Sequence, residues 1–135
     1  MSLRMIDYNG HEIPDTNGAA LAAGANGTSV AGTVVPVNAG LGAGSTITGV
    51  NANDRTGQFV ATAAGTPAAG KIASVFFAQP YATAPKAVVV TVVNTTDGTA
   101  SLTVAANNIT AAGFDVYATA PTAAKAYLVC YSVHV

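Results

Sequence analysis

The side chains that could carry out chemistry are few in this sequence, and their spacing matches no catalytic or metal-binding motif. His11 and His134 are the only histidines, and the stretch "HEIPD" that begins at His11 lacks the HExxH spacing of a zinc site. The six acidic residues are dispersed, so no catalytic acid pair is recognisable. No GxSxG nucleophile elbow occurs, and the glycine-rich "GAGSTITG" lacks the Gly-Lys-Ser/Thr of a phosphate-binding loop. We therefore expect no catalytic residue, no metal and no cofactor, and we predict that the protein is not an enzyme.

The other reactive and charged groups argue against two classes of partner. Cys130 is the single cysteine, which excludes an internal disulfide and a cysteine metal cluster. The five Lys and Arg residues are scattered and the net charge is -1, so the chain has no electrostatic footprint for nucleic acid. No apolar run approaches the roughly 18 residues of a membrane helix, and the N-terminal "MSLRMIDYNGHEIPD" lacks the apolar segment of a secretory signal. We expect neither nucleic acid nor a membrane as a partner.

The low content of charged residues is the strongest feature of the composition. Charged residues make up 8% of the chain, whereas about 25% is usual for a soluble domain. Ala, Gly and Thr take their place. Two interpretations fit: a small domain with a Thr/Ser/Asn surface, or a protein that buries much of its surface in an assembly. We favour the assembly, because a surface with few charges does little to keep copies apart.

Short apolar segments separated by turn signals begin at Thr46 and predict an all-β protein. No segment keeps a helical period, and Asp97-Gly98 is a signal for a tight hairpin. We predict an antiparallel β-sandwich over residues 46–135, preceded by an extended N-terminal arm over residues 1–45 in which Pro36 restricts a short strand to an edge position. The expected strands are Thr46–Val50, Gln58–Thr62, Lys71–Gln79, Lys86–Asn94, Thr99–Ala106, Phe114–Thr119 and Lys125–Val135.

Several of these strands are apolar on both faces. In the last strand, one face has the core-like residues Tyr127, Val129, Tyr131, Val133 and Val135, and the other face includes Leu128 and Cys130. The valine strand has the same character, with Val89 and Val93 on its second face. An antiparallel sheet that is apolar on both faces must be covered on both. We therefore predict that Val89, Val93, Leu128 and Cys130 form an oligomer interface, covered by the arm or by a neighbouring copy.

The motif "YATAP" occurs twice, at Tyr81–Pro85 and at Tyr117–Pro121. Each proline fixes extended geometry at the alanine before it and cannot donate a ladder hydrogen bond, so each is expected to end a loop and begin a strand. We expect the rings of Tyr81 and Tyr117 to lie over the ends of the sandwich.

A series of features follows in a set order from Asn53 to the C-terminus: "NDRTGQFV", the glycine-led strand "GKIASVFF" that ends in aromatic residues, the proline bracket "PYATAPKAVVV", the segment "ITAAGFDVYATAP" and the closing strand "AYLVCYSVHV". In this order they resemble a β-sandwich module of tailed-phage virion proteins, especially those of actinobacteriophages. The module is found in capsid decoration proteins and in the terminal domains of tail fibres or minor tail proteins. The stretch "FFAQPYATAPKAVVV" is also loosely similar to small H-type lectins, which keeps sugar binding open.

The resemblance implies a non-enzymatic virion structural protein. The sequence has no long shaft or coiled coil before the sandwich, which favours a capsid decoration (cement) protein: a homotrimer, made in the host cytoplasm, that binds the major capsid protein on the capsid surface. We expect Met5, Ile6, Tyr8 and Ile13 to anchor the arm to the capsid or to a sister subunit. The alternative is a receptor-binding tail tip, in which the loops Asn51–Thr56 and Asn94–Gly98 would contact host glycans.

Overall fold

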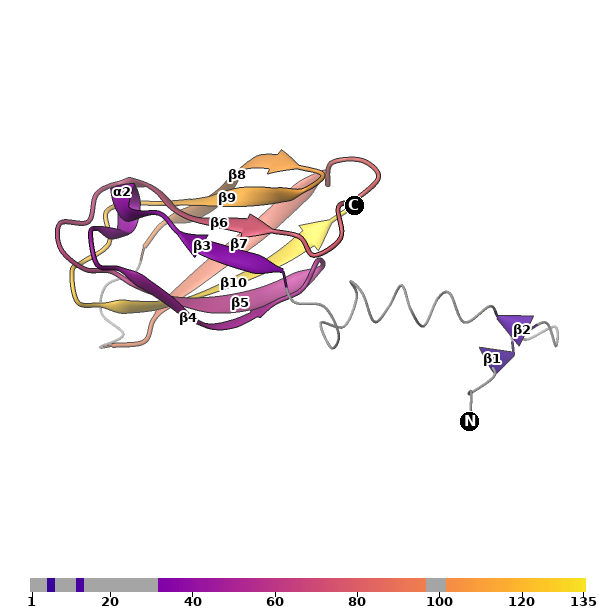
Figure 1. The fold of residues 1–135 in the computed structure, drawn as a ribbon, viewed down its shortest axis with the longest axis horizontal. Helices are drawn as coiled ribbons and strands as arrows, with labels where there is room; N and C mark the ends of the chain where they lie inside the picture. The colour runs from indigo at the N-terminus through magenta and orange to yellow at the C-terminus, as the bar shows by residue number, and fades with distance from the viewer. Residues whose placement is uncertain (1–4, 7–11, 14–31, 97–101) are drawn as a thin grey trace.

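The computed structural model describes residues 5–6, 12–13, 32–96 and 102–135 (Figure 1). Regular structure in these parts is almost entirely β, as predicted. Within them the one helix is four residues long, and nothing there is long and apolar enough to cross a bilayer as a helix. The elements are β1 (Met5–Ile6), β2 (Glu12–Ile13), β3 (Thr33–Pro36), α2 (Asn38–Leu41), β4 (Thr46–Ala52), β5 (Thr56–Thr62), β6 (Gly70–Phe76), β7 (Ala87–Asn94), β8 (Val104–Thr110), β9 (Gly113–Ala118) and β10 (Ala126–His134).

Two antiparallel four-stranded sheets form the sandwich, and Figure 1 shows them as two layers. The first sheet has the strand order β4-β5-β10-β7, and the second has the order β3-β6-β9-β8. Among the described residues, the short strands β1 and β2 pair only with each other, with Met5 opposite Ile13. The antiparallel β-sandwich predicted from the turn signals and the two-residue alternation is confirmed.

The core lies between the two sheets and is built from alternate residues of each strand. Tyr127 and Val129 of β10 are fully buried, and Tyr131 and Val133 are 5% exposed. Phe59 of β5 meets them from the neighbouring strand, in register with Val129. The other large side chains that are fully buried come from the second sheet and the segment that follows β3; they are Leu41, Ile72, Val75 and Val116. The alternation that predicted the inner face of β10 is therefore correct from Tyr127 to Val133, and Val135 beyond the strand is exposed.

The sandwich begins earlier in the chain than residue 46, the boundary expected from the sequence. Strand β3 pairs with β6 as an edge strand, which confirms the position predicted from Pro36. Leu41 of α2 is fully buried, and its carbonyl accepts a hydrogen bond from the N–H of Ala64 at 3.0 Å. Residues 33–45 therefore belong to the sandwich rather than to an arm, because they supply an edge strand and a core side chain.

Strand β8 also differs from the prediction. The sequence predicted a strand over Thr99–Ala106, of which residues 99–101 lie outside the described part of the chain, whereas β8 runs from Val104 to Thr110. Asn108 has φ of 50° and lies where the pairing with β9 shifts register. Asparagine tolerates this left-handed geometry, so the residue makes a bulge inside the strand instead of ending it.

Candidate functional site

The turn between β4 and β5 joins the first sheet to the connection between β6 and β7. The Asn53 side-chain oxygen accepts hydrogen bonds from the N–H groups of Arg55 and Thr56, both at 2.9 Å, which closes an Asx turn. The Asp54 carboxylate accepts from the N–H groups of Ala78 at 2.7 Å and Gln79 at 3.0 Å. Asp54 is 4% exposed, so this carboxylate is committed to holding the backbone and is not available to a ligand.

A chain of aromatic rings leads from this turn into the core. The Tyr81 ring lies edge-on to Phe77 at a centroid distance of 5.0 Å, and its hydroxyl donates to the Asp54 carbonyl. Phe77 contacts Phe114, and Phe114 packs edge-on against Tyr131 at 5.1 Å. The Tyr131 hydroxyl donates to the Asn53 carbonyl at 2.8 Å. Burial raises the pKa of both phenols, with the Asp54 charge adding to the effect, so both remain protonated donors.

The two tyrosines of the repeated "YATAP" motif have different positions. Tyr81 contacts Phe77 and the β4–β5 turn, as expected for a ring that closes one end of the sandwich. Tyr117 is part of β9 and is 38% exposed. The expectation for Tyr117 is wrong, because it lies opposite Lys71 of β6 within the ladder and two residues from the outward-facing Asp115.

The candidate site is the outer face of the first sheet, the side turned away from the second sheet. None of the four strands β4, β5, β10 and β7 contains Asp, Glu, Lys or Arg. Their register gives two rows of outward side chains: Val93, Leu128 and Val60 in one row, and Thr91, Cys130 and Gln58 in the next. The face thus combines apolar groups with hydroxyl, amide and thiol groups and contains no Asp, Glu, Lys or Arg, and exposed His134 lies on it at the end of β10.

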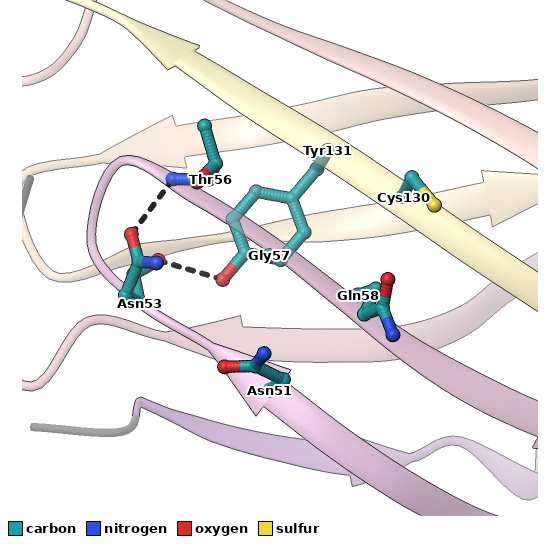
Figure 2. Close-up of a pocket in the computed structure, with 7 residues that line it drawn as sticks. All are labelled: Asn51, Asn53, Thr56, Gly57, Gln58, Cys130 and Tyr131. Carbon is teal, nitrogen blue, oxygen red and sulfur yellow. Dashed lines mark hydrogen bonds between the residues drawn. The ribbon is translucent and has the colours of Figure 1, made fainter. Parts of the chain in front are cut away.

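Two hollows lie on this face and share Cys130 and Tyr131. The larger has a volume of about 360 Å³ and is shown in Figure 2. The smaller, about 210 Å³, extends toward β7. In Figure 2, Gln58 of β5 and Cys130 of β10 come from neighbouring strands, and Asn51 lies on the next strand, β4. The larger hollow is lined by Asn51, Asn53, Thr56, Gly57, Gln58, Cys130 and Tyr131, and the smaller by Val89, Thr91, Cys130, Tyr131 and Ser132.

The linings of these hollows favour contact rather than catalysis. They offer amide, hydroxyl and thiol groups, and their one phenol, Tyr131, has a raised pKa and donates to the Asn53 carbonyl. Among the residues that the structure describes, no group of three or more His, Cys, Asp or Glu side chains could hold a metal ion. Neutral hydrogen-bonding groups beside exposed valines match the composition of a protein contact surface.

All four residues predicted to form an oligomer interface lie on this outer face. Val89 and Val93 of β7 are 52% and 58% exposed, and Leu128 and Cys130 of β10 are half-buried. Leu128 lies opposite Val93 in the ladder. Sequence analysis did not select Val60, Thr91 or Gln58, although Val60 could have been found because it alternates with the core residues Phe59 and Ala61 along β5.

The structure describes only some of the other residues that the sequence predicted as site residues. Met5 and Ile6 form β1 and Ile13 belongs to β2, whereas Tyr8 lies outside the described residues. The loop at Asn94 keeps its side chain buried, with its oxygen accepting from the N–H of Thr96 at 2.9 Å. Residues 97–98 of that loop lie outside the described part of the chain.

The outer face of the second sheet has a different character, because it contains a partly buried ion pair. Lys71 Nζ lies 2.8 Å from Asp115 Oδ1, and the side chains are 32% and 11% exposed. The Ser74 hydroxyl donates to the same oxygen at 2.8 Å, and the Asn108 amide donates to Oδ2 at 3.2 Å. Burial alone would raise the pKa of the Asp115 carboxyl, but the hydrogen bonds from Lys71, Ser74 and Asn108 and the Lys71 charge outweigh it and hold the pKa below its ordinary value of 3.8.

We expect the Asp115→Asn variant to be less stable than wild type by about 1–2 kcal/mol at neutral pH, because a neutral amide cannot form an ion pair with Lys71. Folding lowers the pKa of Asp115, so the ionised carboxylate stabilises the fold above its ordinary pKa of 3.8. That contribution disappears as the pH falls through the lower pKa of the folded state. Urea unfolding at a series of pH values should therefore show the difference between the two proteins shrinking at acidic pH. A difference that stays constant down to strongly acidic pH would contradict this account.

Comparison with known proteins adds no relative: no family model matches this chain, and no curated protein or solved structure matches it.

Proposed function

We propose that this protein is a non-enzymatic structural protein of a virion, and specifically a homotrimeric capsid decoration protein that binds the major capsid protein on the shell surface. The observation that supports the proposal most is the outer face of the first sheet, where Val89 and Val93 of β7 are exposed and the four strands contain no Asp, Glu, Lys or Arg. Such a face is typical of a surface that is covered in the working assembly. The virion location and the three-fold symmetry are inferred from the resemblance of residues 53–135 to tailed-phage virion modules.

The proposed mechanism is passive. A protein that binds only the assembled shell stabilises that shell by mass action, and it needs no catalytic group. Leu128 and Cys130, with Val89 and Val93, would form the contact between subunits, and the N-terminal residues Met5, Ile6, Tyr8 and Ile13 would anchor each subunit to the shell. The commitment of Asp54 and Tyr131 to internal hydrogen bonds is consistent with an architectural role.

Co-sedimentation tests the proposed role directly. The purified protein is mixed with undecorated shells of the virus that encodes it and, separately, with cell walls of the host. We expect sedimentation with shells, and its loss when residues 1–15 are deleted. Sedimentation with cell walls but not with shells would overturn the decoration role.

A substitution on the outer face tests the oligomer contact. Leu128→Asp places a charge in the centre of this face, next to Val93 in the register, and should lower the mass measured by light scattering to one third of that of wild type. Ala105→Asp is the matched control, because Ala105 is exposed on β8 of the other sheet. A folded Leu128→Asp protein with the wild-type mass would contradict the proposed interface.

A receptor-binding tail tip is the second candidate, and one observation favours it. Phe76 and Tyr117 are 49% and 38% exposed on strands β6 and β9, which also contain the Lys71–Asp115 ion pair. Exposed rings beside fixed polar groups can stack on and hydrogen-bond to a sugar. Binding to host cell walls that is lost on Tyr117→Ala, and retained on Leu128→Asp, would support this candidate over the first.

A further inference from the structure

Strand β7 forms one edge of the first sheet, and its ladder is the longest at an edge of the sandwich that runs without a register shift. Within the described residues it pairs with β10 alone. The pairing runs without a shift from Ala87 opposite His134 to Asn94 opposite Tyr127. An edge strand of this kind presents a row of N–H and C=O groups to which another strand can bind.

The other three edge strands each have a feature that limits such pairing. Strand β3 has four residues and ends at Pro36. Strand β4 shifts register after Thr48, where Gly49 has φ of 57°, and β8 shifts register at Asn108. Short strands, prolines and bulges are the features by which native proteins protect their edges. Strand β7 has none of them, and it contains no charged residue.

The sequence of β7 is also self-complementary. From Val89 to Val93 it reads Val-Val-Thr-Val-Val, which is the same in both directions with Thr91 at the centre. Two antiparallel copies related by a two-fold axis at Thr91 would place like residues opposite each other. The Val89 of one copy would lie opposite the Val93 of the other, and both side chains are exposed, at 52% and 58%. Cross-strand pairs of β-branched residues stabilise such a ladder.

We propose that β7 pairs antiparallel with β7 of a second copy, about a two-fold axis at Thr91, so that two four-stranded sheets become one continuous eight-stranded sheet. In this pairing the outward residues of one β7 lie opposite the outward residues of the other, so the outer faces of the two copies lie on the same side of the joined sheet. This inference does not rest on the proposed virion role. Because the contact is two-fold, it differs from the three-fold contact proposed above, and it would join one trimer to another.

A cysteine at the axis tests the pairing. In Thr91→Cys, the two new thiols would face each other across the two-fold axis, where directly opposite Cβ atoms lie about 4.5–5.5 Å apart, close to what a disulfide requires. The variant must also contain Cys130→Ser, because Cys130 lies opposite Thr91 within the same chain and would compete for the new thiol. Air oxidation should give a disulfide-linked dimer on a non-reducing gel.

The control is Ala105→Cys in the same Cys130→Ser background, since Ala105 is exposed on an edge strand of the other sheet. It should remain largely uncrosslinked. Absence of the dimer in Thr91→Cys, or equal crosslinking of the control, would overturn the proposal.

A second variant measures the same contact without a crosslink. Thr91→Lys puts two like charges at the axis, and the mass measured by light scattering at micromolar concentration should fall by half relative to wild type. Ala105→Lys should leave the mass unchanged. A folded Thr91→Lys protein with the wild-type mass would count against the pairing. Neither measurement uses shells, so failure here and failure of the proposed function are distinguishable.

Discussion

Asp54→Ala is expected to destabilise the sandwich by about 3 kcal/mol or more, the larger of the two principal effects. The carboxylate accepts hydrogen bonds from the N–H groups of Ala78 and Gln79, and hydrogen bonds to a charged group contribute about 1.5–3 kcal/mol each. The substitution also removes the side-chain hydrogen bonds that hold the β4–β5 turn in place, and the Tyr81 hydroxyl donates to the backbone carbonyl of residue 54 in that turn. Urea unfolding followed by circular dichroism measures the change through the midpoint at constant slope.

Arg55→Ala is the matched control for this prediction. Arg55 is adjacent in the same turn but is exposed, so its replacement should change the free energy of unfolding by less than about 0.5 kcal/mol. Asp54→Asn should lie between the two, because an amide oxygen can accept from one N–H group while its own N–H₂ group faces the other. Equal stability of Asp54→Ala and Arg55→Ala would show that the turn does not depend on the carboxylate.

Gly57→Ala is expected to cost about 2–3 kcal/mol, although alanine is the smallest possible addition. A Cβ atom at position 57 would overlap the ring and hydroxyl of Tyr131, the residue opposite it in the ladder. The ring cannot move freely, because it is buried against Phe114 and its hydroxyl donates to the Asn53 carbonyl. The larger hollow of Figure 2 would change shape together with this loss of stability.

A double-mutant cycle separates this clash from a general effect of replacing glycine in a strand. In a Tyr131→Leu background the ring is absent, so Gly57→Ala should cost much less than it does in wild type. Gly49→Ala is not a suitable control, because Gly49 has φ of 57° and its substitution is strained for a different reason. An equal cost of Gly57→Ala in both backgrounds would remove Tyr131 from the explanation.

Most strands of this fold could be predicted from the sequence, because the signals for them are local. The alternation of Tyr127, Val129, Tyr131 and Val133 specifies the inner face of β10 wherever the strand pairs. By contrast, β3 and α2 belong to the sandwich because Leu41 is buried in its core. The Gly- and Ala-rich segment around Leu41 has no periodic pattern from which this contact could be predicted. Asn107-Asn108 has the composition of a turn, and only the pairing with β9 makes it a bulge.

The candidate site also has a part that could be predicted from the sequence and a part that could not. The outward residues Val89, Val93, Leu128 and Cys130 follow from alternation along two strands. The hollows beside them do not, because Gln58 and Asn51 reach Cys130 only through the strand order β4-β5-β10. The role of Asp54 could not be predicted from the sequence either, because its hydrogen-bond partners are 24 and 25 residues further along the chain.

The position of β10 at the centre of the first sheet has a consequence for how the chain folds. Its two neighbours, β5 and β7, both precede it in the sequence, and they do not pair with each other. During synthesis, at about 5–20 residues per second, the valine-rich β7 is therefore made several seconds before β10, the strand with which it pairs in the described part of the chain. Contacts of such long sequence separation form slowly, so the nascent chain must keep β7 unpaired until β10 emerges. A self-complementary strand without charges is prone to premature association in that interval, and the rate of translation between residues 94 and 126 is expected to affect the yield of folded protein.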